Sequence, residues 1–224
     1  MAKRIKLRDR LLPDYTRGEE IMNMVTHIVG GSLAVLILVL CVVKAAVGGN
    51  IPGVIGSVIY GCAMILLYCM SSIYHGLHTG TGKKVMQVLD HCTIYFLICG
   101  TYTPIMLSAF VPVYPVLGWC ILAVEWGLAF LAATLTAIDL HKYDKFSMVC
   151  YILMGWAIIF FVPQAIAVMT KPGFILLLLG GIAYTVGAVL YGIGGKMQWM
   201  HSVFHIVVVL GSVLQFLAIF FYVL

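Results

Sequence analysis

His201-Ser-Val-Phe-His205-Ile-Val-Val-Val-Leu210 opens the last apolar run of the chain and carries two histidines four residues apart. In an α-helix, residues at i and i+4 project from one face, one turn above the other. That spacing lets a single helix present two imidazoles to one metal ion. Polar side chains are costly where a helix enters hydrocarbon, so they mark candidate functional positions. The run therefore predicts a membrane helix with a metal-binding pair near one end.

The composition is that of an integral membrane protein. Of the 224 residues, 63% are hydrophobic and 9% are charged, and the mean hydropathy is +1.10; soluble globular domains are far more polar. The seven cysteines lie in or beside apolar runs without a CxxC pair, so we expect free thiols buried in the spans rather than a disulfide framework. The net charge of +5 is unevenly distributed along the chain, and we predict no nucleic-acid partner.

Seven apolar stretches follow a polar, basic segment at residues 1–20. Each stretch is long enough to cross a hydrocarbon core of about 30 Å, and continuous runs of this length predict helices rather than barrel strands. We therefore predict an all-α membrane protein with a basic N-terminal arm at 1–20 and a seven-transmembrane helix bundle at 21–224. The predicted spans are about 21–47, 51–76, 85–110, 113–138, 146–169, 173–193 and 198–223.

The positive charges fix the predicted orientation. One side of the membrane would carry the arm and every second loop, with Lys3, Arg4, Lys6, Arg8, Arg10, Arg17, Lys83, Lys84, Lys142, Lys145 and Lys196. The other side would carry only Lys44 and Lys171. Because cytoplasmic loops are enriched in Lys and Arg, the N-terminus is predicted to be cytoplasmic and the C-terminus outside.

This topology brings distant polar residues to one depth. His75 ends the second span, Asp90 lies near the start of the third, and His201 and His205 start the seventh. The three histidines are predicted to bind a metal at the cytoplasmic end, and imidazole ligands without a thiolate favour Zn²⁺. Three histidines leave a fourth position for water, as in catalytic zinc sites. Asp90 would either fill that position or hold the water from outside the ligand set.

Further polar residues share faces with these. Ser71 lies on the face of His75, four residues before it. Glu20, Asn23 and His27 follow the spacing i, i+3, i+7 at the start of the first span. They would support the metal site from its second shell or by packing, or else form a solvated cap on the helix. His78, His91 and His141 are predicted not to be ligands.

A few residues inside the spans carry packing information. Gly180, Gly187 and Gly194 recur every seven residues and predict a close approach of another helix. Pro104 and Pro163 predict kinks. Two polar side chains lie deep within the predicted spans. Gln215 lies on nearly the same helix face as His201, and Glu125 would line a cavity or bond a neighbouring helix.

These residues together resemble a known family. The patterns Glu20-x2-Asn23-x3-His27, Ser71-x3-His75 with Asp90, and His201-x3-His205 resemble the three motifs of the hemolysin III family, the bacterial branch of the progestin and adipoQ receptor (PAQR) family. Gly100-Thr-Tyr-Thr-Pro104 and Gly180-Gly-Ile-Ala-Tyr184 also resemble bacterial members. The resemblance implies a multi-pass protein of the bacterial plasma (inner) membrane that has seven helices with the N-terminus inside. It also implies a zinc ion at the residues matching the three histidines, with Asp90 and Ser71 close by.

The resemblance also frames the function. The wider set of proteins includes alkaline ceramidases, which implies hydrolysis of a lipid amide. Our leading hypothesis is a zinc hydrolase acting on an acyl amide or ester of a membrane lipid, in which Asp90 orients or deprotonates the water and Ser71 donates a hydrogen bond to the oxyanion. The fatty acyl chain would lie among the apolar helices. The alternatives are a non-enzymatic sensor or regulator of membrane homeostasis with a structural zinc, and, with less support, a cytolytic protein.

Overall fold

The structure, a computed structural model, describes residues 7–194 and 197–224. Every regular element in this part of the chain is helical, which confirms the predicted all-α class. Four of the cations used for the predicted orientation, Lys3, Arg4, Lys6 and Lys196, lie outside the described residues.

Seven elements form the long helices. They are α1 (Arg17–Val47), α2 (Ile51–Gly76), α3 (Thr81–Ile105), α5 (Pro115–Ile138), α6 (Leu140–Trp156), α7 (Val162–Gly194) and α8 (Met200–Tyr222). The shorter ones are η1 (Leu7–Asp9), the π-helical η2 (Met106–Phe110), α4 (Val111–Val113) and the 3₁₀-helical η3 (Ala157–Phe161).

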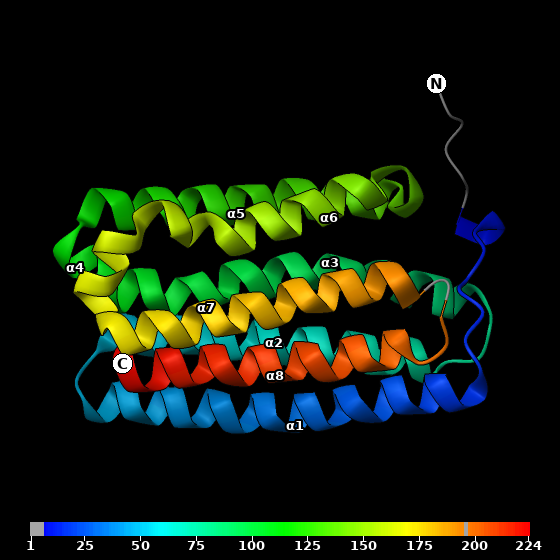
Figure 1. Cartoon of the computed structure of the whole chain (residues 1–224), viewed down its shortest axis with the longest axis horizontal. Coiled ribbons are helices and arrows are strands. Elements are labelled where there is room, and N and C mark those ends of the chain that lie inside the picture. The colour runs from blue at the N-terminus through cyan, green and yellow to red at the C-terminus, as the bar shows by residue number, and fades with distance from the viewer. Residues whose placement is uncertain (1–6, 195–196) are drawn as a thin grey trace.

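The long helices lie side by side along one axis (Figure 1). Consecutive helices run in opposite directions, so α1 and α8 begin at the same end of the bundle at which α2 ends and α3 begins. We call this the N-terminal end. The segment between η1 and α1 crosses it, from the side of α3 to the start of α1 (Figure 1).

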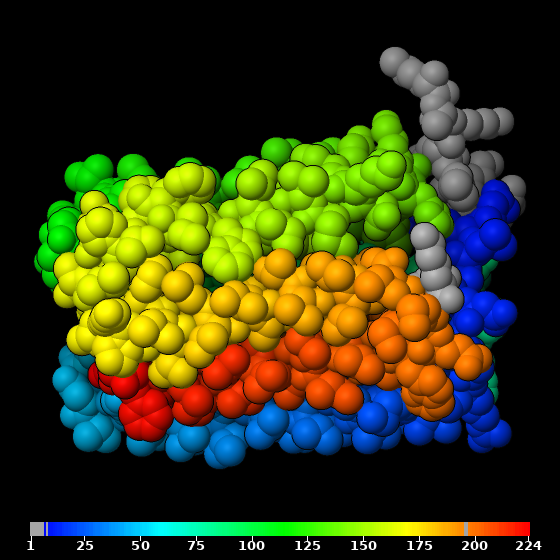
Figure 2. Space-filling model, viewed as in Figure 1, coloured from blue at the N-terminus to red at the C-terminus, as the bar shows by residue number. Residues whose placement is uncertain are grey.

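Six stretches of the described chain are long and apolar enough to cross a membrane. One of them, Asp144–Gly194, has 51 residues and contains two of the seven predicted spans. Figure 2 shows a lateral face on which α6, α7, α8 and α1 follow one another. Each contributes large exposed apolar side chains, such as Leu153, Val186, Leu210 and Val43. Such a surface is stable against lipid tails and not against water, so the chain is a membrane protein.

The long stretch changes direction within α7. Thr170 has φ 64° and ψ 163°, which breaks the helix, and Pro172 follows two residues later. A positive φ is strained for a β-branched residue and marks a turn. Figure 1 shows the chain reversing at the end of the bundle opposite the N-terminal end. The helix type also changes next to both prolines predicted to cause kinks, because a proline removes one backbone N–H: η2 follows Pro104, and η3 precedes Pro163.

The glycine stripe on α7 faces α8, as predicted. A Cβ on Gly180 would lie 2.5 Å from Gln215 Cγ and 3.1 Å from the Gly211 carbonyl oxygen. A Cβ on Gly194 would lie 3.2 Å from the backbone nitrogen of His201. The missing side chains let α8 approach α7 closely, and this approach holds the first turn of α8 in place.

The start of α1 is fastened to the start of α8. Thr16 and Glu19 form a capping box on α1, and Glu19 Oε1 also accepts a hydrogen bond of 2.8 Å from the backbone nitrogen of Trp199. The helix begins at Arg17, so the last four residues of the predicted arm are helical. This bond places the polar stripe of α1, which consists of Glu20, Asn23 and His27, at the depth of the histidines of α8.

All seven cysteines are free, which confirms that the fold uses no disulfide. Not all are buried as predicted: Cys62, Cys69 and Cys120 are exposed on the outer surface of the bundle, where a thiol is compatible with an apolar surrounding.

Candidate metal centre

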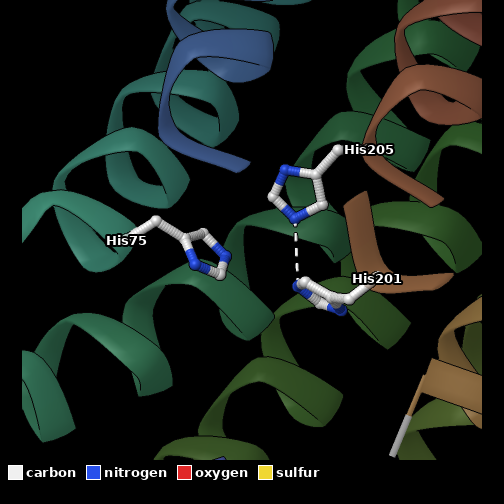
Figure 3. Close-up of side chains that lie close together, drawn as sticks. All are labelled: His75, His201 and His205. Carbon is white, nitrogen blue, oxygen red and sulfur yellow. Dashed lines mark hydrogen bonds between the residues drawn. The ribbon is translucent and has the colours of Figure 1, made fainter. Parts of the chain in front are cut away.

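Three histidines from two helices meet at the N-terminal end of the bundle. His75 lies in the last turn of α2, and His201 and His205 lie in the first two turns of α8. Each offers one ring nitrogen, and these three atoms lie within 4.8 Å of one another, all on buried side chains. Figure 3 shows the three rings pointing toward a common centre. Among the residues that the structure describes, this is the group of side chains that could hold a metal ion.

The hydrogen bonds leave one nitrogen of His75 available for this centre. Its Nδ1 lies 2.7 Å from Glu20 Oε2, and a carboxylate oxygen can only accept, so Nδ1 carries the proton. Its Nε2 is buried and has no partner among the described residues. A carboxylate bonded to the far nitrogen of a histidine is the arrangement found around metal-ligating histidines.

His205 is oriented in the same way. Its Nδ1 donates to the backbone oxygen of Asn23 at 3.3 Å, which leaves Nε2 as an acceptor in the neutral ring. This Nε2 lies 3.1 Å from Nε2 of His201 (Figure 3). Two nitrogen ligands of a tetrahedral zinc ion are separated by about 3.3 Å. The separation therefore fits two ligands of one metal, and the orphaned Nε2 of His75 fits the third.

The polar stripe of α1 contacts the histidines directly. Glu20 bonds His75, while Asn23 lies 3.4 Å from His75 Nδ1 through Nδ2 and accepts a 2.6 Å hydrogen bond from Ser202. The ring of His27 stacks on that of His205, with centroids 3.7 Å apart. Asn23 and His27 are fully or almost fully buried. The alternative of a solvated cap therefore does not describe this stripe.

A lysine in the first turn of α3 holds the carboxylate of Glu20 in place. Lys83 Nζ lies 2.7 Å from Glu20 Oε1 and also donates to the backbone oxygen of Leu77. Its side chain is only 5% exposed, so the ion pair is screened from solvent and holds the carboxylate ionised beside His75.

Asp90 and Ser71 line a cavity next to the histidines. The cavity measures about 180 Å³ and is bordered also by His201 and His205. The Ser71 hydroxyl interacts with the Asp90 carboxylate. From this polar end the cavity continues between apolar side chains of α3, α7 and α8, and Gln215 borders it at depth. Its shape suits a molecule with one polar end and an apolar tail.

Glu125 lies elsewhere. It is 1% exposed on α5, near Cys99 and Tyr102 of α3, and it does not border the cavity. Its Oε2 has no hydrogen-bond partner among the described residues, so neither the predicted cavity position nor the predicted bond to a neighbouring helix is confirmed. The other histidines are not in the cluster: His91 bonds the Gln87 carbonyl oxygen and Tyr191, and His141 is exposed at the start of α6.

Tyr15 covers the histidines from the N-terminal segment. Its ring stacks on His201 with centroids 4.8 Å apart and planes inclined by 24°, and it lies 5.8 Å from the ring of His75. Burial, with smaller contributions from Tyr191 and Glu20, raises the pKa of the Tyr15 phenol above its ordinary value, so the hydroxyl is protonated at neutral pH. Tyr15 also borders the cavity.

Tyr15, Lys83 and Ser202 were not predicted from the sequence. Lys83 lies outside the predicted third span, 85–110, although the structure includes it in the first turn of α3. Tyr15 precedes α1, so the helical spacing that identified the other residues does not apply to it. Ser202 directly follows His201 in the sequence, and this position next to a candidate ligand was the one signal that could have identified it.

Comparisons with known proteins identify the family of the chain. A family model described as haemolysin-III related matches residues 15–216. The chain is 37% identical to Hemolysin-3 of Bacillus cereus over 206 residues, which cover 92% of each chain. It is 35% identical to the Hemolysin-3 homolog of Bacillus subtilis (strain 168) over 208 residues, 93% of this chain and 96% of the relative. The match spans the histidine cluster and the stripe of α1, and it confirms the resemblance found in the sequence: the chain belongs to the haemolysin-III family.

Proposed function

We propose that the protein is a zinc-dependent hydrolase of the bacterial plasma membrane that cleaves an acyl amide or ester of a membrane lipid. The observation that carries the proposal is the junction of a three-histidine cluster and a carboxylate at the polar end of a long, mostly apolar cavity. A structural metal site needs no such cavity, whereas a lipid hydrolase needs both.

The donor set fits zinc. Three imidazoles without a thiolate among them, two of which have the far nitrogen hydrogen-bonded, favour Zn²⁺ over softer or harder ions. A zinc ion held by His75, His201 and His205 would supply a Lewis acid that polarises the scissile carbonyl and lowers the pKa of a water molecule.

The residues of the chain supply the remaining functions. Asp90 borders the cavity beside the histidines, where its carboxylate would accept the proton of the attacking water. Ser71, next to Asp90, would donate a hydrogen bond to the carbonyl oxygen as negative charge develops on it. Glu20 and Asn23 keep the histidine rings oriented. Tyr15 would exclude bulk water, and the apolar part of the cavity would hold the acyl chain.

The membrane topology we infer has seven spans with the N-terminus in the cytoplasm. A single 51-residue helix would be about 77 Å long, more than twice the hydrocarbon thickness. The break at Thr170 and the reversal beside it support two crossings in Asp144–Gly194. The described cations Lys83, Lys142 and Lys145 lie at the N-terminal end, which supports a cytoplasmic position for the metal centre.

A second function has support from a different observation. The proposed ligands come from α2 and α8, and α1 packs against both. A metal there would tie together two helices far apart in the sequence, as a structural zinc does. In that case the protein would be a membrane-homeostasis sensor or regulator without an enzymatic step. The relatives carry the name hemolysin, and a cytolytic action is the third and weakest candidate, because the uniformly apolar surface fits permanent insertion.

Asp90→Asn separates the first two functions. The substitution keeps the size of the side chain and removes the base, so the hydrolase should retain zinc and lose release of fatty acid from ceramide or phospholipid analogues by about 10²-fold or more. Zinc content by mass spectrometry and fatty-acid release from protein in liposomes are the measurements.

The control is Asp144→Asn, which removes another carboxylate that borders the cavity and does not belong to the group that could hold the metal. Equal release by parent and Asp90→Asn would exclude Asp90 from catalysis. Absence of release from every supplied lipid, together with a large loss of thermal stability in chelator, would favour the structural role.

A further inference from the structure

Arg10 is a buried cation, and two of its three guanidinium nitrogens have no acceptor in the part of the chain that the structure describes. It lies between η1 and α1, in the segment that crosses the N-terminal end of the bundle (Figure 1). Its side chain is only 4% exposed. Its Nε and Nη1 are buried and have no hydrogen-bond partner among the residues that the structure describes. A guanidinium in this position is costly unless an anion or several acceptors reach it.

A second cavity lies beside Arg10. It measures about 210 Å³ and is bordered by Leu7, Arg10, Val85, Val88, Leu89 and Ala137. Arg10 is thus the single polar residue in a lining that is otherwise aliphatic. Val85 and Leu89 are exposed on the outer side of α3, where the bundle meets lipid. The cavity therefore combines one buried cation with an apolar wall that continues toward the hydrocarbon.

This combination fits a phospholipid better than water or a free anion. The guanidinium fork matches a phosphate in a bidentate geometry and forms strong charge-assisted hydrogen bonds with it. The aliphatic wall would contact the first methylene groups of an acyl chain. Water could form hydrogen bonds with the guanidinium, but it makes no favourable contact with the aliphatic side chains that line the cavity.

The surroundings favour an anionic headgroup over a zwitterionic one. Arg17, Lys142 and Lys145 are exposed at the N-terminal end of the bundle, which is the cation-rich end. A choline or ethanolamine group would bring another cation to this surface, whereas a glycerol headgroup leaves the lipid with a net negative charge that a cation-rich surface attracts.

We propose that Arg10 and the cavity beside it form a binding site for one anionic phospholipid of the leaflet at the N-terminal end. The site is separate from the histidine cluster and does not require hydrolysis or zinc. A bound phosphate would hold Arg10, and with it the segment that carries Tyr15 over His201. The lipid would thereby order the cover of the metal centre.

The test uses the full chain purified in a neutral detergent and titrated with single lipids. Thermal unfolding and native mass spectrometry measure binding of phosphatidylglycerol, phosphatidylcholine and, as a separate arm, inorganic phosphate. Phosphatidylglycerol should stabilise the parent protein and stay bound, and Arg10→Gln should weaken its apparent affinity by about tenfold or more. Arg17→Gln is the matched control: it removes the same charge from an exposed position seven residues away, and it should change the affinity by less than about twofold.

Ala137→Trp tests the cavity without touching Arg10. Ala137 is exposed, so an indole would fill the cavity from outside the packed core and displace the lipid. Ala137→Trp should reduce phosphatidylglycerol binding as Arg10→Gln does. If Arg10→Gln does not fold, binding by Ala137→Trp alone tests the proposal. Equal binding by the parent and the folded variants would overturn the proposal. Equal stabilisation by phosphatidylcholine, or by inorganic phosphate alone, would also overturn it, because the site would then not select an anionic lipid.

Discussion

At the residue scale, the metal centre depends on three ring nitrogens that other residues hold in place. Removing one imidazole leaves two ligands, too few for tight binding of zinc. We expect His201→Ala and His205→Ala to lose the metal from purified protein, measured by inductively coupled plasma mass spectrometry, while the parent carries about one zinc per chain. His141→Ala is the control, since His141 is exposed and outside the cluster. Unchanged metal content in both variants would exclude these ligands.

The Glu20 carboxylate, which is bonded to His75, should affect zinc affinity almost as strongly as a metal ligand does. Glu20 fixes the proton of His75 on Nδ1 and is itself held by Lys83. Glu20→Gln keeps the size but weakens both contacts, and we expect it to lower zinc affinity by about 10–100-fold in a competition with a chelating dye. Lys83→Met removes the other partner of Glu20 and leaves its contact with His75, so its loss should be smaller. A parental affinity in Glu20→Gln would mean that the His75 ring is oriented by its packing alone.

The residues of this site differ in how visible they were in the sequence. His201, His205 and the stripe of α1 follow helical spacing, so a uniform helix geometry was sufficient to group them. Tyr15 reaches His201 through a segment without regular structure, and no periodicity describes that path. The contact of Glu19 with Trp199 depends on the fold of the whole chain. Local regularity was therefore predictable from the sequence, and contacts made by irregular segments were not.

At the element scale, the pairing of α7 with α8 positions two of the three histidines. Gly180→Ala places a Cβ 2.5 Å from Gln215 Cγ and 3.1 Å from the Gly211 carbonyl oxygen. The side chain of Gln215 can move, but the backbone of α8 has to shift. We expect a loss of about 1–3 kcal/mol in the free energy of unfolding, measured by thermal or denaturant unfolding in detergent.

Gly192→Ala provides the comparison on the same helix. A Cβ on Gly192 would meet nothing within 4 Å, so this substitution should be neutral or stabilise α7 by up to about 1 kcal/mol through helix propensity. Equal effects of the two substitutions would show that the stripe does not control the approach of α8. The stripe itself was visible in the sequence because small residues at a seven-residue interval mark one helix face. The predicted spans 146–169 and 173–193 leave a short connection that includes Thr170, but its place inside one nearly continuous helical stretch depends on backbone angles that composition does not encode.

At the scale of the whole molecule, the number and direction of the crossings decide where the metal centre lies. The stretch Asp144–Gly194 is long enough for two crossings, and with two crossings His141 and Lys171 lie on opposite sides of the membrane. Single cysteines at these two positions, in a chain whose native cysteines are replaced by serine or alanine, can be labelled with a membrane-impermeant maleimide in intact cells and in inverted vesicles. We expect Lys171→Cys to react from outside and His141→Cys from the cytoplasmic side. If both positions react from the same side, the stretch Asp144–Gly194 crosses the membrane only once. A single crossing would reverse the direction of α8 relative to α2 in the membrane. His75 and His201 would then lie on opposite faces of the bilayer, and neither the shared metal nor the proposed hydrolase would be possible.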